Sequence, residues 1–331
     1  MTQSHPEPSR RTLLTGLASG VAAAGLVPPV ASRAADIVAE TVASVGPKTR
    51  YGRVKVGEAS VFYREAGAAD APVILLLHGF PTASHMFRNL MPALADRYRV
   101  IAPDLPGFGN TVTPPRGQFE YSFDNLAKVI EGFVDAIGLH RYALYIFDYG
   151  APTGLRLAMA HPERVSAIIT QNGNAYVEGL SDNWGPWQTY WRDPTPAHRE
   201  ATRVSLNDEA IAYQYQHGAP ADLVAPDGYL LDTYYMHRDG AEEIQLDLIL
   251  SYRTNVALYP AFQAYFRRYQ PPVLAVWGKN DPFFIPPGAL AYRRDNPEAE
   301  IHFLDAGHFA LETHHQEIAV LMREFLGRKL V

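Results

Sequence analysis

The sequence predicts an α/β fold, in which a mostly parallel sheet is flanked by helices and carries one long helical insertion. Apolar, β-prone runs alternate with helical patterns between residues 73 and 170, and such alternation is typical of a parallel sheet with helices on both faces. The alternation stops over residues 173–269, which are helix-prone and rich in Tyr and Trp, and strands resume at Val273. A chain of 331 residues, 47% hydrophobic and 19% charged, is long enough for one such core with an inserted subdomain.

The predicted elements follow one another in a regular order. An opening β-hairpin covers residues 52–65 and is interrupted by a turn at 57–58. Further strands are predicted at residues 73–78, 99–102, 142–147, 165–170, 273–277 and 301–304, and helices at 84–97, 123–137 and 152–161. The core is therefore expected to comprise residues 46–172 and 270–331, and the helical insertion residues 173–269.

The first 45 residues differ in composition from the rest. Arg10 and Arg11 precede a weakly apolar run, rich in Ala and Gly, that reaches Val30 and is followed by small residues at 31–35. The pattern resembles a twin-arginine signal, which directs folded proteins out of the bacterial cytoplasm. An ordinary N-terminus with a chance arginine pair is the alternative. The signal interpretation assigns residues 1–45 to a signal and linker, names the twin-arginine export machinery as a partner, and predicts a periplasmic or secreted protein.

Composition excludes several other classes of function. A net charge of -6 argues against nucleic acid or an anionic membrane as a partner. We find no Gly-rich phosphate loop, no basic stripe and no metal-ligand spacing in the sequence, so neither a cofactor nor a metal is expected. The absence of cysteine excludes disulfides and thiol catalysis. The sequence does not indicate an oligomeric state.

Asp148 is the first candidate catalytic residue. It follows the apolar run 142–147 and precedes a helical pattern, which is the strand, sharp turn and helix of a nucleophile elbow. Gly150, two residues further on, lacks the Cβ that would clash in so tight a turn. An aspartate in that place can attack carbon and form an ester with the substrate. The alternative is an ordinary Asp in a turn between strand and helix.

Asp281 and His308 are the expected partners of Asp148. Each follows a predicted strand, and the carboxyl ends of strands in open α/β sheets are where ligands bind. The three residues follow one another along the chain in the order nucleophile (Asp148), acid (Asp281) and base (His308). His308 would activate the water that hydrolyses the ester, and Asp281 would fix the His308 tautomer. The backbone N–H groups of Phe80 and Tyr149 are the expected oxyanion donors.

Five segments carry a resemblance to a known family, and they are residues 78–81, 102–109, 145–152, 278–281 and 307–308. On these segments the chain, from about residue 53 onward, resembles α/β-hydrolases of the epoxide hydrolase and haloalkane dehalogenase group with an Asp nucleophile. The resemblance implies the α/β-hydrolase fold and a helical cap, residues 173–269, that closes over Asp148. One departure is Ile146, which stands where the group usually has a small residue.

The resemblance also suggests roles for cap residues. Epoxide hydrolases use cap tyrosines to donate a proton to the ring oxygen, and Tyr252 lies in a segment that resembles the second of these. Trp187 takes the expected place of the first tyrosine, and Tyr190 lies one helical turn further on. Dehalogenases bind the halide with indole or asparagine N–H groups, whereas Phe80 and Tyr149 stand at two of those places here. Any of these aromatic residues could instead simply pack the cap.

The resemblance and the motifs together predict a cofactor-independent hydrolase. Its substrate would be a small, mostly apolar epoxide, which Asp148 opens with assistance from Tyr252, while Phe80, Tyr149, Trp187 and Tyr190 bind the substrate or the oxyanion. Haloalkane dehalogenation by the same three residues is the first alternative. Ester or lactone hydrolysis is a weaker alternative, and a non-catalytic binding protein with this fold is the last.

Overall fold

The computed structural model describes residues 48–330, so the predicted signal segment lies outside the described residues. An eight-stranded sheet has the strand order β1-β2-β4-β3-β5-β6-β7-β8. β2 pairs antiparallel with both β1 and β4, and all other neighbours are parallel. The strands are β1 Arg50–Val56, β2 Ala59–Ala66, β3 Val73–Leu77, β4 Arg99–Pro103, β5 Tyr142–Phe147, β6 Val165–Gln171, β7 Val273–Gly278 and β8 Glu300–Leu304. The predicted fold class, a mostly parallel sheet flanked by helices, is confirmed.

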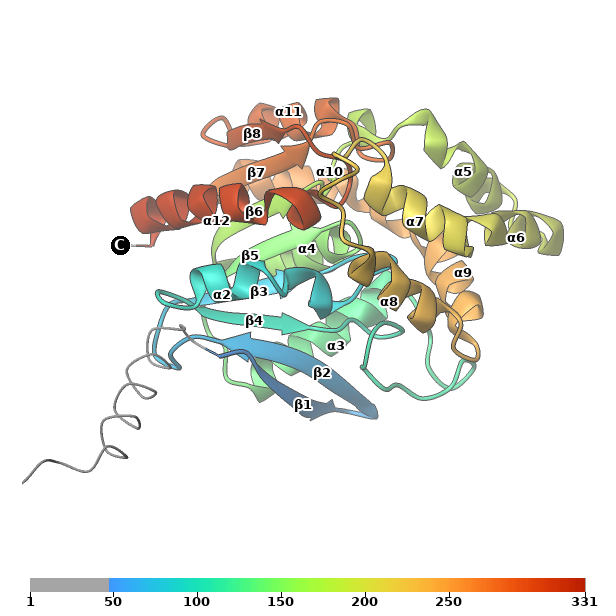
Figure 1. Ribbon diagram of the computed structural model, residues 1–331, viewed down its shortest axis with the longest axis horizontal. Helices are drawn as coiled ribbons and strands as arrows, with labels where there is room; N and C mark the ends of the chain where they lie inside the picture. Colours follow the sequence, from blue (N-terminus) through green and yellow to red (C-terminus); the bar gives the residue numbers. More distant parts are fainter. Residues whose placement is uncertain (1–47, 331) are drawn as a thin grey trace, which may run out of the picture. The chain divides into compact units, whose positions relative to one another are not determined.

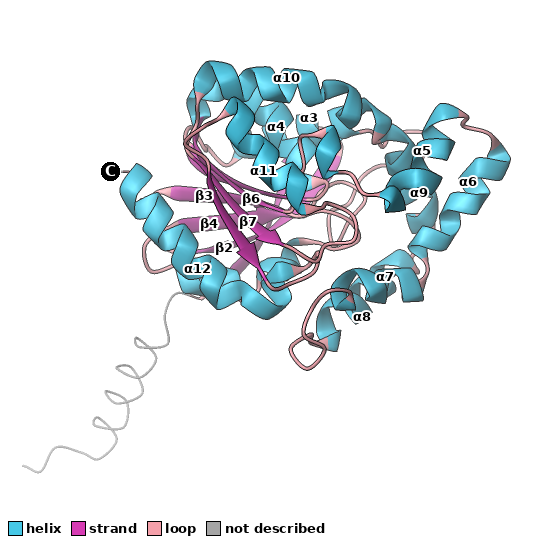
Figure 2. Cartoon of the chain, turned by 90° about the horizontal axis from the view of Figure 1, so that it is seen from above, coloured by secondary structure: helices cyan, strands magenta, loops and turns pink. Residues whose placement is uncertain are grey.

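Helices cover both faces of this sheet (Figure 2). The core helices are α2 Leu90–Leu94, α3 Phe123–Ala136, α4 Gly150–Ala160, α11 Pro286–Asp295 and α12 Ala310–Lys329. The continuous helix predicted over 84–97 is instead a 3-10 turn, η1 Ser84–Phe87, followed by the short α2. The interruption has a local reason, because Pro92 has no N–H to donate to the residue 88 carbonyl and its ring clashes with a continuous helix there.

Alternate residues of the central strands enter two different apolar cores. Leu77 and Ile146 pack with α3, α4, α11 and the later helix α10 (Arg253–Tyr269) on one face of the sheet. Leu76 and Phe147, their neighbours in the chain, pack with α2 and α12 on the other face. Because side chains of a strand alternate between faces, central strands buried on both sides are continuous apolar runs, as β3 and β5 are.

The helical insertion lies between β6 and β7 and contains α5 Gly185–Arg192, α6 Pro196–Thr202, α7 Asp208–Gln216, α8 Pro226–Met236, α9 Ala241–Ser251 and α10 Arg253–Tyr269. Helices α5 to α9 lie together beyond one end of the sheet (Figures 1 and 2). Helix α10 returns from α9 to the core, where it contacts α4 and α11. None of the helices in the described part of the chain is both long and apolar enough to span a membrane.

Ile146, the unusually large residue two positions before the predicted nucleophile Asp148, is accommodated by Gly154 of α4. A Cβ on Gly154 would lie 2.7 Å from the Ile146 Cγ2 atom and 3.0 Å from Leu144 Cδ2. The missing side chain of the helix therefore makes room for the extra bulk on the strand. The elbow remains tightly packed, with Ile146 fully buried.

We predict that Gly154→Ala destabilises the protein by about 1–3 kcal/mol, because the added methyl overpacks the space occupied by Ile146. Ile146→Ala on its own should also destabilise it, by leaving a cavity. In the double variant the two penalties should partly cancel, since each change relieves the other. Urea unfolding of the four proteins measures this coupling; strictly additive changes would contradict the packing argument.

Candidate active site

Asp148 lies in the turn between β5 and α4 with an unusual backbone conformation. Its φ is 45°, a left-handed value that is uncommon outside glycine and is concentrated at functional sites. Two glycines permit the crowding around it. A Cβ on Gly79 would lie 2.3 Å from Asp148 Oδ1, and one on Gly150 would lie 2.3 Å from the Leu77 carbonyl oxygen. Glycine at 79 and 150 thus brings the loop after β3 directly against the Asp148 side chain.

The two carboxylate oxygens of Asp148 have different environments. Oδ1 accepts a hydrogen bond of 2.6 Å from the Phe80 N–H, and the Tyr149 N–H also favours the charged form. Oδ2 lies 4.0 Å from His308 Nε2. Burial raises the pKa of Asp148 to about 6, although His308 and the two N–H groups oppose this shift. One oxygen is therefore fixed by the backbone while the other faces the histidine.

His308 is oriented by Asp281. Its Nδ1 lies 2.7 Å from Asp281 Oδ2, so a proton on Nδ1 leaves Nε2 as the basic nitrogen on the side of Asp148. Burial by itself would lower the pKa of His308, but the charge and hydrogen bond of Asp281, with a contribution from Asp148, raise it above its ordinary value. This arrangement suits a general base whose protonated form is stabilised.

Asn172 is a site residue that the sequence analysis missed. Its Nδ2 donates to Asp281 Oδ2 at 2.7 Å, and its Oδ1 accepts from the Gly278 N–H at 2.9 Å. Two further N–H groups, of Phe283 and Phe284, donate to Asp281 Oδ1. Asn172 directly follows β6, and its position at the carboxyl end of a strand is the feature of the sequence that could have identified it as a site residue.

A cavity of about 370 Å³ opens onto Asp148 and His308. Its aromatic lining comes from core and insertion, and consists of Phe80, Trp184, Trp187, Tyr213 and Phe283. The other polar side chains on its wall are Asn183, Ser205 and Gln214, and no Lys or Arg of the described residues lines it. A larger open hollow, of about 920 Å³ between residues 116–128 and the α9–α10 region, includes neither Asp148 nor His308.

The structure brings only some of the predicted binding residues to this cavity. Phe80 and Trp187 line it, whereas Tyr149 and Tyr190 do not. The Tyr149 ring is fully buried and packs 4.9 Å from Phe123 between ring centroids. Tyr149 thus contacts Asp148 through its backbone N–H, and its side chain does not line the cavity.

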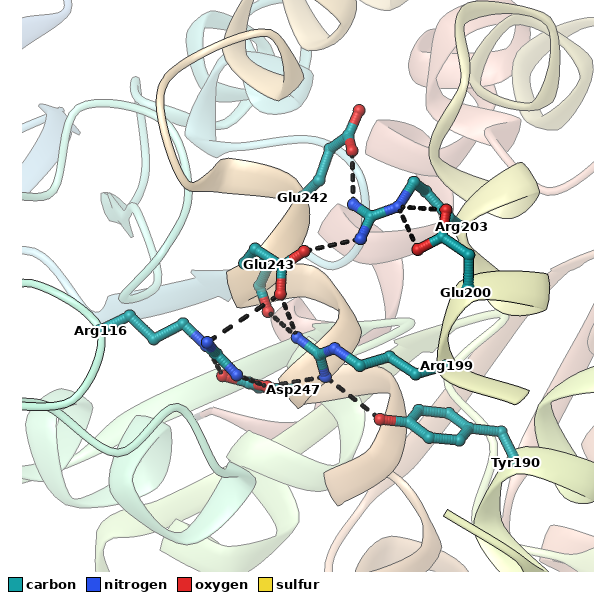
Figure 3. A network of polar contacts seen from close by, with 8 residues as sticks. All are labelled: Arg116, Tyr190, Arg199, Glu200, Arg203, Glu242, Glu243 and Asp247. Atoms are coloured by element: carbon teal, nitrogen blue, oxygen red, sulfur yellow. Dashed lines mark hydrogen bonds and ion pairs between the residues drawn. The ribbon is translucent and has the colours of Figure 1, made fainter. Parts of the chain in front are cut away.

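Tyr190 belongs to a separate polar network (Figure 3). Its hydroxyl accepts a hydrogen bond of 3.1 Å from Arg199, and Arg199 also binds Glu243 and Asp247 of α9. Hydrogen bonds from Arg199 and Arg203 lower the pKa of Glu243 to about 2. The one-turn spacing from Trp187 does not place Tyr190 at the cavity; its hydroxyl instead meets Arg199 of α6, which the carboxylates of α9 hold in place.

Tyr252 lies behind the cavity wall. It is fully buried, its ring stacks on Trp191 at 5.6 Å, and it lies 4.8 Å from the ring of Trp184, which does line the cavity. Burial raises its pKa well above the ordinary value, with further contributions from Tyr259 and the charge of Asp148. The hydroxyl is therefore protonated at all ordinary pH values and is affected by the charge of the nucleophile, although Tyr252 does not line the cavity.

Solved structures with the same fold include enzymes of both predicted kinds. A loop variant of the haloalkane dehalogenase DbeA from Bradyrhizobium elkanii superposes with a TM-score of 0.71 at 21% identity, covering 86% of this chain and 98% of its own. The epoxide hydrolase CorEH superposes with a TM-score of 0.69 at 16% identity, covering 85% and 99%. At these identities the similarity establishes the fold alone.

Two relatives cover most of the chain in sequence. A protein of Saccharomyces cerevisiae described as an uncharacterized hydrolase, YNR064C, is 48% identical over 276 residues, which are 82% of this chain and 94% of its own. A haloalkane dehalogenase of Psychrobacter cryohalolentis is 24% identical over 283 residues, which are 81% of this chain and 88% of its own.

The yeast relative overturns the predicted localisation. A eukaryotic protein of such high identity conflicts with a bacterial twin-arginine signal, so the prediction of a periplasmic or secreted bacterial protein is wrong. The arginine pair and the Ala- and Gly-rich run that prompted it form a short pattern of low specificity. That segment lies outside the described residues.

The family assignment agrees with the geometry of the site. Residues 72–315, which include the elbow, the insertion and both partner loops, match the family model of the alpha/beta hydrolase fold. The strand order, the position of Asp148 after β5 and the partner loops after β7 and β8 are those the fold requires. This chain belongs to the alpha/beta hydrolase family and is a hydrolase.

Proposed function

We propose that this hydrolase opens a small uncharged epoxide through a covalent ester on Asp148. The observation that carries the proposal is the asymmetric setting of the Asp148 carboxylate, with Oδ1 held by the Phe80 N–H and Oδ2 facing His308. A carboxylate with one free oxygen at a cavity wall can attack an electrophilic carbon. The aromatic lining of the cavity favours a mostly apolar substrate.

The reaction would proceed in two steps. Asp148 Oδ2 attacks a ring carbon, the carbon–oxygen bond of the epoxide breaks, and the ring oxygen takes up a proton. His308 Nε2 then removes a proton from water, which attacks the ester carbon of Asp148 and releases a vicinal diol. The Phe80 and Tyr149 N–H groups stabilise the oxyanion that develops at Oδ1, and Asp281 stabilises the imidazolium.

Tyr252 is the proposed donor to the ring oxygen. Its raised pKa keeps the hydroxyl in the protonated form that can donate, and the Asp148 charge acts on it. Because Tyr252 does not line the cavity and packs against Trp184, which does, the proposal requires these rings to shift when substrate binds. Tyr190 has no role in it, since its hydroxyl is engaged by Arg199.

Two observations favour an uncharged epoxide over other substrates. The cavity has no Lys or Arg of the described residues on its wall, so no permanent positive charge there offsets the repulsion between Asp148 and an anionic substrate. The indole N–H groups of Trp184 and Trp187 already donate to the Phe283 carbonyl and to Ser205, both at 3.0 Å, and are not free for a halide. Haloalkane dehalogenation remains the second candidate, because Trp187 lines the cavity and its indole N–H donates only to the hydroxyl group of Ser205.

The pH dependence of ester formation tests the role of Asp148. Since the carboxylate is the nucleophile and its pKa is raised to about 6 by burial, the rate should fall as the pH drops through about 6. Below that value we expect roughly a tenfold loss per pH unit. Single-turnover fluorescence quenching of the cavity tryptophans follows this step, with Asp148→Asn as a control that forms no ester. An acid limb near the ordinary aspartate value would contradict the assignment.

Intact-protein mass of His308→Gln tests the ester directly. Without its base this variant should stall after the first step when exposed to epoxides or haloalkanes. An epoxide adduct carries the whole mass of the epoxide, whereas a haloalkane adduct lacks the hydrogen halide. Asp148→Asn combined with His308→Gln should form neither. An active wild type whose His308→Gln variant forms no adduct would refute the ester mechanism.

The same experiment isolates Tyr252. Tyr252→Phe in the His308→Gln background should slow the epoxide adduct by roughly a hundredfold or more, as loss of a general acid does. Formation of a haloalkane adduct should be unchanged, because a halide leaves without a proton. Equal slowing of both adducts would show that Tyr252 only packs the cavity wall.

A further inference from the structure

One polar side chain on the cavity wall has no role in the reaction proposed above. Gln214 of α7 lines the cavity with Asp148 and His308, and its exposed fraction is 7%. Ser205 accepts from the Trp187 indole and Asn183 donates to the Pro282 carbonyl. For the Gln214 amide, no hydrogen bond to any of residues 48–330 is formed. Because Gln214 lines the cavity and is not among the residues with fully buried, unpartnered side-chain atoms, its amide remains accessible to a ligand there.

The position of Gln214 is fixed by contacts of the residues that follow it in the chain. Its neighbour Tyr215 stacks on Phe309, next to His308, with ring centroids 3.7 Å apart and an angle of 9° between the planes. The Tyr215 hydroxyl donates to the buried Asp232 of α8 at 2.5 Å. Burial against Phe309 and the bond to Asp232 thus hold the end of α7 to the loop that carries the base.

The segment that follows α7 rests on the catalytic loops as well. Asn280, next to Asp281, donates its side-chain N–H to the Gly218 carbonyl at 2.9 Å. A Cβ on Gly307 would lie 1.9 Å from the His217 carbonyl oxygen, so the two backbones are in direct contact there. The backbone that carries Gln214 is therefore held close to the loops of Asp281 and His308, and a site on such a fixed element can orient a ligand.

We infer that Gln214 binds an uncharged polar group of the substrate, at a point away from the reacting carbon. Only the identification of the reacting group as an epoxide rests on the proposed function. An amide offers one acceptor and two donors but no charge, so it suits a hydroxyl, ether or carbonyl group. With no Lys or Arg of residues 48–330 on the wall and the Asp148 carboxylate nearby, a carboxylate substituent is disfavoured. The preferred substrate is then an epoxide with a neutral polar substituent rather than a purely apolar one.

Binding of two matched probes tests this role without any turnover. The probes are a six-carbon terminal vicinal diol that ends in a hydroxyl group and the seven-carbon diol that ends in a methyl group instead. Quenching of Trp184 and Trp187, which line the cavity, reports the affinity of the full-length protein for each. Gln214→Met keeps the length of the side chain and removes the amide. Gln216→Met makes the same change at an exposed position of the same helix.

The ratio of the affinities for the two probes shows whether Gln214 binds the hydroxyl group. In Gln214→Met the preference for the hydroxyl probe should fall by roughly tenfold relative to wild type, as expected for loss of a hydrogen bond in a buried site. Gln216→Met should retain the wild-type ratio. An unchanged ratio in Gln214→Met, or equal weakening of both probes, would overturn the inference.

Turnover separates this inference from the proposed function. For glycidol and butylene oxide, which differ by a hydroxyl in place of a methyl, Gln214→Met should raise KM for glycidol alone. A wild type that hydrolyses neither epoxide would refute the proposed function, while the ratio of probe affinities would still decide the role of Gln214.

Discussion

The hydrogen bond from the Phe80 N–H to Asp148 Oδ1 is the contact on which the whole site depends. It requires the loop after β3 to touch the turn after β5, and glycine at 79 and 150 is what allows that approach. The same contact makes the two oxygens of Asp148 inequivalent, because one is held by the backbone and the other is left to face His308. Even the left-handed backbone of Asp148 serves this geometry, since it directs the side chain out of the turn.

Burial gives the site its chemical character as well as its shape. Burial raises the pKa of Asp148 to about 6, although His308 and the Phe80 and Tyr149 N–H groups oppose this shift. Burial would lower the pKa of His308, but the charges of Asp281 and Asp148 raise it above its ordinary value. Asp281 is itself held by Asn172 and by two backbone N–H groups. A buried carboxylate is tolerated only with such partners. The acid and base are consequently fixed in place before any substrate arrives, which is what electrostatic preorganisation requires.

Periodicity and chain order predict much of the core but little of the insertion. Runs such as β5 are recognisable because a strand buried on both faces is continuously apolar, and residues after parallel strands converge at one edge, as Asp148, Asp281 and His308 do. Helix faces in the insertion follow no such rule. Tyr190 pairs with Arg199 of α6, which the carboxylates of α9 bind, and Gln214 lies at the cavity next to Tyr215, which stacks on Phe309. The accommodation of Ile146 by Gly154 likewise depends on contact between two elements, which spacing alone does not reveal.

The origin of the oxygen atom in the first product molecule tests the central claim most directly. Wild-type enzyme in excess would convert a substrate once in water labelled with the heavy oxygen isotope, and product and enzyme would then be weighed by mass spectrometry. If Asp148 forms an ester that water attacks at the carboxyl carbon, the product carries an unlabelled oxygen from Asp148 and the label appears in the peptide that contains Asp148. Label in the first product, with Asp148 unlabelled, would mean that water attacks the substrate directly and would contradict the account.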